Sequence, residues 1–150
     1  MSVGEGLKLR AADAEDLQVL SACLQDAIMP IGDMAFERAA RRFVMVANRF
    51  CWERAERAGG DAFDRVNCGV TFEGVNAVKL RHIDQSDRSL LLSLLAITAE
   101  PRPRGTAITL VCAGDRDIRL ETDGIAARLE DVDQSWPTRN RPAHRLDEPA

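Results

Sequence analysis

The chain has 150 residues, of which 45% are hydrophobic and 29% charged, the composition of an ordinary globular protein and not of a disordered or fibrous chain. A chain of this length buries roughly two thirds of the surface that it exposes when unfolded, so we expect one domain with a substantial core. The net charge of −4 argues against electrostatic capture of nucleic acid or of an anionic membrane as the main activity.

The N-terminal region predicts a short strand followed by a helix. Residues 7–11 alternate between apolar and basic side chains, as a strand does. Asp13 then offers a side-chain oxygen that caps a helix, which we expect to run to about Gln25. Its apolar face comprises Leu17, Leu20, Leu24 and Ile28.

The next segment predicts two antiparallel strands. Turn residues between Pro30 and Asp33 end the helical pattern, and Met34–Arg38 reads as a strand. The apolar run that begins at Phe43 is β-branched and aromatic, which favours a second strand over Arg42–Trp52, with residues 39–41 as the turn. Residues 53–64 hold a Gly-Gly pair and are expected to form a loop.

The clearest alternation in the chain covers residues 65–72 and predicts a half-buried strand. Glu73 and Gly74 end it in a turn or a bulge, and Val75–Ile83 reads as another strand. The inward side chains of the first of these strands are Val66, Cys68, Val70 and Phe72.

The leucine-rich segment Leu90–Ala99 fits either a short helix capped by Ser86 or Asp87, or a buried strand. We favour the strand, because Ile97 and the threonine after it lead directly into a Glu-Pro pair.

The C-terminal third predicts a hairpin, a helix and a tail. Thr106–Ala113 and Ile118–Glu121 form the hairpin. Asp123 is expected to cap a last helix whose apolar stripe is Ile125, Leu129 and Val132. The tail is rich in proline and is expected to be extended or disordered unless Trp136 anchors it.

Together these elements predict an α+β fold, with residues 1–133 as a single domain and residues 134–150 as a C-terminal tail. The expected architecture is a curved antiparallel meander sheet or partly open barrel. An N-terminal helix precedes it, and a C-terminal helix closes it as in pleckstrin-homology-like domains.

Several site classes lack their sequence signals. No glycine-rich phosphate loop occurs, and the four cysteines show no metal-binding spacing, so we expect free thiols, no metal and no cofactor. Neither an apolar signal segment nor a membrane-spanning run is present, and we expect a cytoplasmic protein.

The strongest candidate site combines polar side chains that end apolar strands. Asn48 and Arg49 stand beside the aromatic rings of Phe50 and Trp52, an arrangement suited to an anion or a flat ligand. If the sheet brings a second basic pair close, the two form a basic spot; the alternative for Arg49 is a structural arginine stacked on Trp52 or paired with an acidic residue. The candidate binding residues are Arg42, Asn48, Arg49, Trp52, Arg81 and His82.

Four motifs stand out along the chain: Leu24-Gln25-Asp26-Ala27, Arg42-Phe43 through Asn48-Arg49-Phe50 with Trp52-Glu53, Ser93-Leu94-Leu95-Ala96-Ile97, and Leu129-Glu130-Asp131 with Trp136. With these motifs the chain resembles a bacterial family known as domain of unknown function 2948. The resemblance covers nearly the full chain and implies a bacterial cytosolic protein, but it brings no activity, cofactor or catalytic residue.

Two functional hypotheses follow from these observations. The first is a non-enzymatic binding or adaptor domain whose partner is an unidentified protein or a second copy of the chain, because no catalytic set is evident. The alternative is a small enzyme that uses His82, or a carboxylate such as Asp84, beside Arg49.

Overall fold

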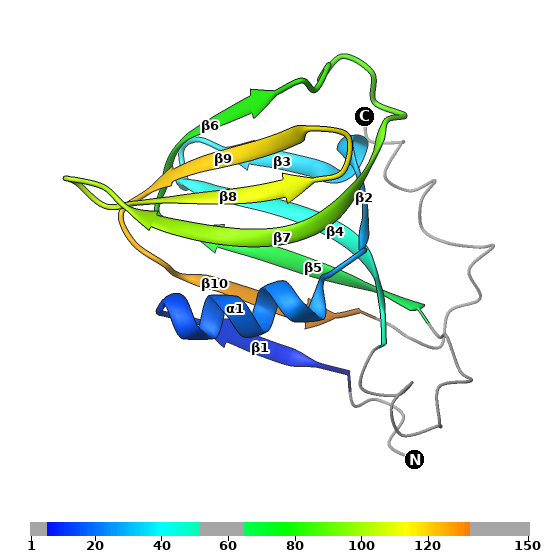
Figure 1. The fold of residues 1–150 in the computed structure, drawn as a ribbon, viewed down its shortest axis with the longest axis horizontal. Helices are drawn as coiled ribbons and strands as arrows, with labels where there is room; N and C mark the ends of the chain where they lie inside the picture. The colour runs from blue at the N-terminus through cyan, green and yellow to red at the C-terminus, as the bar shows by residue number, and fades with distance from the viewer. Residues whose placement is uncertain (1–5, 52–64, 133–150) are drawn as a thin grey trace.

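The computed structural model describes residues 6–51 and 65–132. These residues form one antiparallel sheet of ten strands, with a single α-helix (Figure 1). Along the sheet the strand order is β1-β10-β5-β4-β2-β7-β8-β9-β6, and β3 pairs with β4 beside this path. The elements are β1 (Lys8–Ala11), α1 (Ala14–Cys23), β2 (Ile28–Pro30), a 3-10 turn η1 (Ile31–Asp33), β3 (Met34–Glu37), β4 (Arg42–Phe50), β5 (Arg65–Glu73), β6 (Val75–Arg81), β7 (Leu91–Pro101), β8 (Thr106–Cys112), β9 (Arg116–Thr122) and β10 (Ala127–Asp131).

The sheet curls around a core built from alternate strand residues. In β4 and β5, buried and partly exposed side chains alternate without interruption, as a strand with one face inward requires. Phe43 and Phe72 come from these strands and pack 6.4 Å apart, ring centroid to ring centroid. The predicted inward face of β5 is confirmed, since all of its members are buried.

The helix α1 begins where the sequence predicts it. The Asp13 side chain accepts a hydrogen bond from the Asp16 backbone N–H at 2.8 Å, and Leu17 and Leu20 are buried. The helix packs against β1 and β7, and its Ser21 hydroxyl accepts a hydrogen bond from the Ile97 N–H at 2.9 Å. The predicted apolar face of the helix wrongly includes Ile28, which belongs to β2.

The predicted closing helix at the C-terminus is wrong. Ala127 and Leu129 are buried while the residues between and after them are exposed, so the segment has strand periodicity and forms β10. This strand lies between β1 and β5 and pairs with both. Asp123, the expected cap, instead accepts hydrogen bonds from Arg41 and Asn76 beside the β5–β6 turn.

The other strand predictions are confirmed, including β7 in the ambiguous segment, the β8–β9 hairpin and the β3–β4 pair. The three-residue strand β2 was not predicted from the sequence. The expected loop over residues 53–64 and the tail over residues 134–150 lie outside the described residues. The sheet is mostly meandering and does not close into a barrel; the pleckstrin-homology likeness stays a prediction.

Candidate functional site

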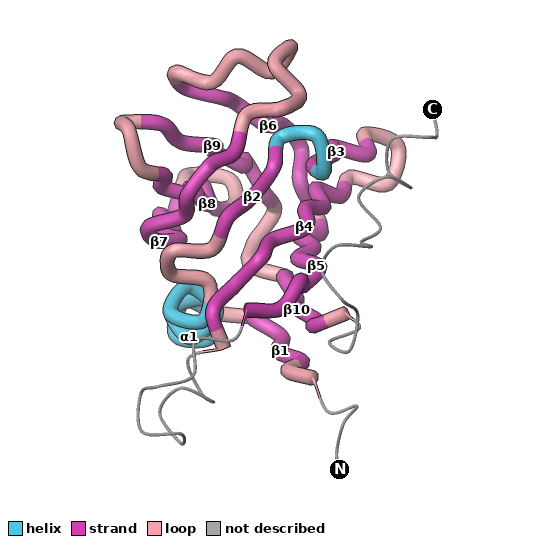
Figure 2. The backbone as a smooth tube through the Cα atoms, turned by 90° about the vertical axis from the view of Figure 1, so that its right-hand side faces the viewer, coloured by secondary structure: helices cyan, strands magenta, loops and turns pink. Residues whose placement is uncertain are grey.

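The sheet stays open between β3 and β6. Within the described residues, β3 pairs only with β4 and β6 only with β9. Over most of their length the Cα atoms of β3 and β6 lie more than 8 Å apart, whereas paired strands lie about 4.8 Å apart. Figures 1 and 2 place both strands at the end of the molecule opposite α1 and β1. We call this opening the seam.

Backbone hydrogen bonds delimit the seam at both ends. At one end the Val75 N–H donates to the Arg41 carbonyl at 2.9 Å, directly after the β3–β4 turn. At the other end the Ile31 N–H donates to the Leu90 carbonyl at 2.9 Å, just before β3. The seam is therefore a slot closed at its two ends and bordered by strands along its sides.

A cavity of about 490 Å³ occupies the seam. Phe43, which is buried on β4, contributes to its lining from the core side. Pockets of this volume that combine apolar side chains with a few polar groups are typical of sites for small molecules. The other apolar lining residues are Ile31, Met34, Ala35 and Phe36 on the β3 side and Val78, Leu80 and Ile83 on the β6 side.

Two exposed arginines stand on the rim of this cavity. The Arg38 guanidinium lies over the Phe36 ring, 5.2 Å from its centroid, and the Arg88 guanidinium donates to the Gly32 carbonyl at 3.1 Å. Neither forms an ion pair with any described residue. By contrast, most arginines of the sheet have a carboxylate partner, so the rim arginines retain their capacity to bind an anion.

Short-range polar contacts fix the loop that carries Arg88. The Asp84 side chain accepts hydrogen bonds from the N–H and hydroxyl of Ser86, and these bonds hold the pKa of Asp84 below its usual range. The Asp87 side chain binds Ser89 in the same way. Gly32 lies so close to this loop that a Cβ there would stand 3.0 Å from the Arg88 carbonyl oxygen. The loop therefore packs closely on η1.

Arg49, the central residue of the predicted site, points into the protein and not into the seam. Its side chain has no exposed surface, and it forms a two-pronged ion pair with Asp131 at 3.0 and 2.8 Å. A third hydrogen bond joins the guanidinium to the Phe50 carbonyl at 3.0 Å, and Asp131 also accepts from the Leu7 N–H at 2.9 Å. The pair thus ties together β1, β4 and β10, as the alternative interpretation of Arg49 anticipates.

Cys68 lies in the field of this ion pair. Burial, together with the nearby Asp131 charge, raises the pKa of its thiol to about 12, while Arg49 opposes the change. The thiol is therefore protonated at neutral pH and unsuited to act as a nucleophile.

Asn48 and Arg42 lie on the outer face of β4, opposite to Arg49. The Asn48 side-chain amide donates to the Asn67 side chain at 3.0 Å. The side-chain and backbone oxygens of Asn48 both accept hydrogen bonds from Arg65. Arg42, at the other end of the strand, pairs with Glu73 at 3.1 Å and with Glu37 at 3.4 Å.

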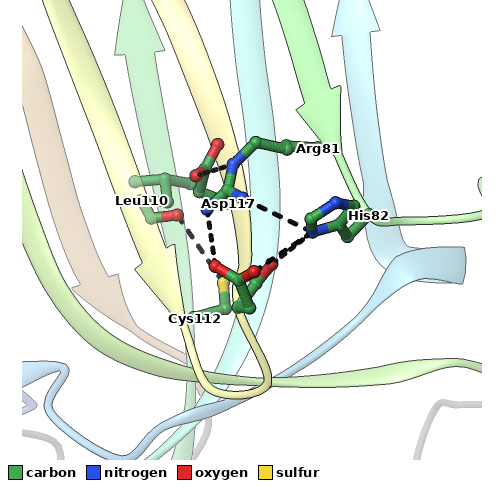
Figure 3. A network of polar contacts seen from close by, with 6 residues as sticks. Arg81, His82, Leu110, Cys112 and Asp117 are labelled. Atoms are coloured by element: carbon green, nitrogen blue, oxygen red, sulfur yellow. Dashed lines mark hydrogen bonds and ion pairs between the residues drawn. The ribbon is translucent and has the colours of Figure 1, made fainter.

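Arg81 and His82 form a separate cluster at the end of β6, against the β8–β9 turn (Figure 3). Arg81 binds Asp117 at 2.7 Å and Asp115 at 3.0 Å, while His82 Nδ1 lies 2.8 Å from the Asp115 carbonyl oxygen. Figure 3 also shows the thiol of Cys112, which donates to the Leu110 carbonyl. Burial raises the pKa of this thiol to about 11.

The structure thus brings together some of the predicted residues and not others. Arg81 contacts His82, but no contact among the described residues joins either of them to Arg49. Trp52 lies outside the described residues. Arg38 and Arg88 were not predicted from the sequence, because what sets them apart is their place on the rim of the cavity, which depends on the folded arrangement.

Residues 6–51 and 65–132 contain neither a metal-binding cluster nor a membrane-spanning helix. No group of three or more His, Cys, Asp or Glu side chains there is placed to hold a metal ion. In the same part of the chain, α1 is too short to cross a bilayer, and no other helix comes closer to the required length and apolarity.

A family model described as "Protein of unknown function (DUF2948)" matches residues 7–144. The chain belongs to this family. The resemblance found in the sequence motifs is thereby confirmed, and it covers every described element from β1 to β10. No curated protein and no solved structure matches the chain. Membership in the DUF2948 family supplies no activity, so the functional argument depends on the geometry of the seam.

Proposed function

We propose that this protein is a non-enzymatic, cytosolic binding domain whose ligand occupies the seam between β3 and β6. The observation that carries the proposal is the combination of a half-open pocket, lined largely by apolar residues, with two rim arginines that form no ion pair with a described residue. The best-fitting ligand has an apolar part for the cavity and an anionic group for the rim.

The electrostatics of the chain support this choice of ligand. The net charge is −4, so two exposed arginines without an ion pair to a described residue are a local feature and not part of a general basic surface. A guanidinium that is not already neutralised gains the most from an incoming carboxylate, since no existing ion pair has to be broken.

The proposal can be tested with three single-chain probes of equal length: decanoate, decanol and decylamine. We expect decanoate to bind and to shift the NMR amide signals of β3, β6 and residues 83–88. Decylamine should bind at least about tenfold more weakly, because its charge is repelled by the rim, with decanol between the two.

The double variant Arg38→Gln/Arg88→Gln should lower decanoate affinity about tenfold or more while leaving decanol binding nearly unchanged. The matched control is Arg10→Gln/Arg104→Gln, which changes the net charge equally on residues away from the cavity lining. Absence of decanoate binding, or equal losses in the two double variants, would contradict the proposal.

A further inference from the structure

We infer that the occupant of the seam is an extended peptide segment of another protein, which pairs as an additional strand with the free edge of β3. This inference rests on the proposed function and specifies its ligand. Strand addition to a sheet edge gives affinity through backbone hydrogen bonds and specificity through pockets for alternate side chains.

The edge of β3 faces the cavity. Three consecutive residues of the strand, Met34, Ala35 and Phe36, line it, and successive residues of a strand point to opposite faces. Contact with all three therefore means that the cavity borders the strand edge and not one face alone. The other edge of β3 is taken by β4, with Ala35 opposite Val44 and Phe36 opposite Phe43.

The seam is wider than the spacing of two directly paired strands. A strand paired with β3 would lie about 4.8 Å from it. The Cα atoms of β3 and β6 lie more than 8 Å apart over most of their length, so β6 leaves the edge of β3 unpaired. A peptide in this position would lie next to Val78 and Leu80, the β6 residues that line the cavity.

Of the other edge strands among the described residues, β1 lies away from the seam and β6 borders the seam from the opposite side. β1 exposes Lys8 and Arg10, and charged side chains on an edge strand oppose strand addition. β6 exposes Lys79 and Arg81, which pair with acidic residues of β9. The central side chains of β3, by contrast, carry no charge.

The rim arginines specify the charges of the peptide. Arg88 contacts Gly32, just before β3 begins, and Arg38 follows directly after β3 ends. Four residues of β3 span about 13 Å, so the slot accepts a short segment with apolar side chains in its middle and an acidic residue toward each end. Alternate apolar residues would enter the cavity.

The test begins with a displayed library of random dodecapeptides selected on the full chain. We expect selected sequences to combine two apolar residues at alternate positions with flanking Asp or Glu. The strongest peptide is then synthesised in three forms: unmodified, and N-methylated at each of the two alternate sets of backbone amides. Alternate amides of an edge strand point to the same neighbouring strand. At least one methylated form should therefore bind at least about tenfold more weakly than the unmodified peptide.

Hydrogen exchange locates the added strand. The unmodified peptide should slow amide exchange in residues 34–37 and leave the other edge strand, β1, unchanged as the internal control. The charge-reversed variant Arg38→Glu/Arg88→Glu should lose the selected peptide and bind the same peptide with lysine in place of its acidic residues.

The outcomes separate the inference from the proposed function. Decanoate could bind in the seam while neither N-methylated peptide binds more weakly than the unmodified one, or while exchange in β3 is unchanged. Either result overturns the strand-addition inference and leaves the binding function standing. The chain could instead dimerise through β3, with a dimer that the peptide does not dissociate. A second copy would then be the occupant, and the inference would also be overturned. If neither decanoate nor any peptide binds, both proposals fail together.

Discussion

Two regions of the sheet use arginine in opposite ways. Near β1 and β10, Arg49 is fully buried, and its guanidinium is held by Asp131 and a backbone carbonyl. At the seam, Arg38 and Arg88 are exposed and form no ion pair with a described residue. The first arginine holds three strands together and has little left to offer a ligand. The other two contribute little to the fold, and their charges remain available for binding.

The largest effect is expected from replacing Arg49 with methionine. Asp131 would keep its Leu7 N–H partner but lose its cation in a buried position, which costs about 3–5 kcal/mol of unfolding free energy. Urea unfolding of the full chain measures this change. The same substitution at the seam, Arg38→Met, removes no ion pair and should change stability by less than about 0.5 kcal/mol.

A second variant separates the cost of an unpaired charge from the loss of packing. Arg49→Met combined with Asp131→Leu removes both charges, so stability should recover by more than half of the single-variant loss. If Arg49→Met and Arg38→Met cost the same, the contrast between the two regions is wrong.

Most of the fold could be predicted from the sequence because many elements have strong local patterns. The Asp13 cap and the unbroken alternation of β5 depend only on neighbouring residues, and both are found as predicted. Around β10, Ile125, Leu129 and Val132 match a helical stripe, while Ala127 and Leu129 also match a strand. The choice between them is made by pairing with β1 and β5, which lie far away in the sequence.

The site was harder to predict than the fold for a related reason. Arg49 and its partner Asp131 are 82 residues apart, so the local pattern of a polar pair beside aromatic rings resembles a binding site although the folded residue is buried. Arg38 is the opposite case. Its proposed role in binding depends on the unpaired edge of β3, which no short stretch of sequence indicates.

A pair of glycine substitutions compares the rigid part of the sheet with the seam. A Cβ at Gly105 would lie 2.0 Å from the Thr122 carbonyl oxygen, and the φ of +88° is itself unfavourable for alanine. Gly105→Ala should therefore cost about 2 kcal/mol or more in urea unfolding. At Gly32, whose φ is not positive, the Cβ would stand 3.0 Å from the Arg88 carbonyl oxygen, so a displacement of a few tenths of an ångström relieves the contact and Gly32→Ala should cost only about 1 kcal/mol.

The control for both is Gly124→Ala, because a Cβ at Gly124 meets no atom within 4 Å. A cost at Gly32 as large as that at Gly105 would show that the loop beside the seam is as rigid as the paired strands. The seam would then be a preformed site with no freedom to adjust to its ligand.

The smallest effect concerns Arg81, an arginine that is exposed and yet paired. Its hydrogen bond and its charge hold the pKa of Asp115 below the ordinary value. A carboxyl whose pKa is lowered by folding adds stability above its unfolded pKa, and this stability is lost as the pH falls through the folded value. Arg81→Gln should therefore raise the pKa of Asp115 in an NMR carboxyl titration and weaken the acid sensitivity of stability below about pH 4. Arg104→Gln, in the turn at the opposite end of β8, should leave that pKa unchanged. An unaltered Asp115 pKa in Arg81→Gln would mean that this exposed pair is not formed in solution, and Arg81 would then belong with Arg38 and Arg88 among the arginines available to an anion.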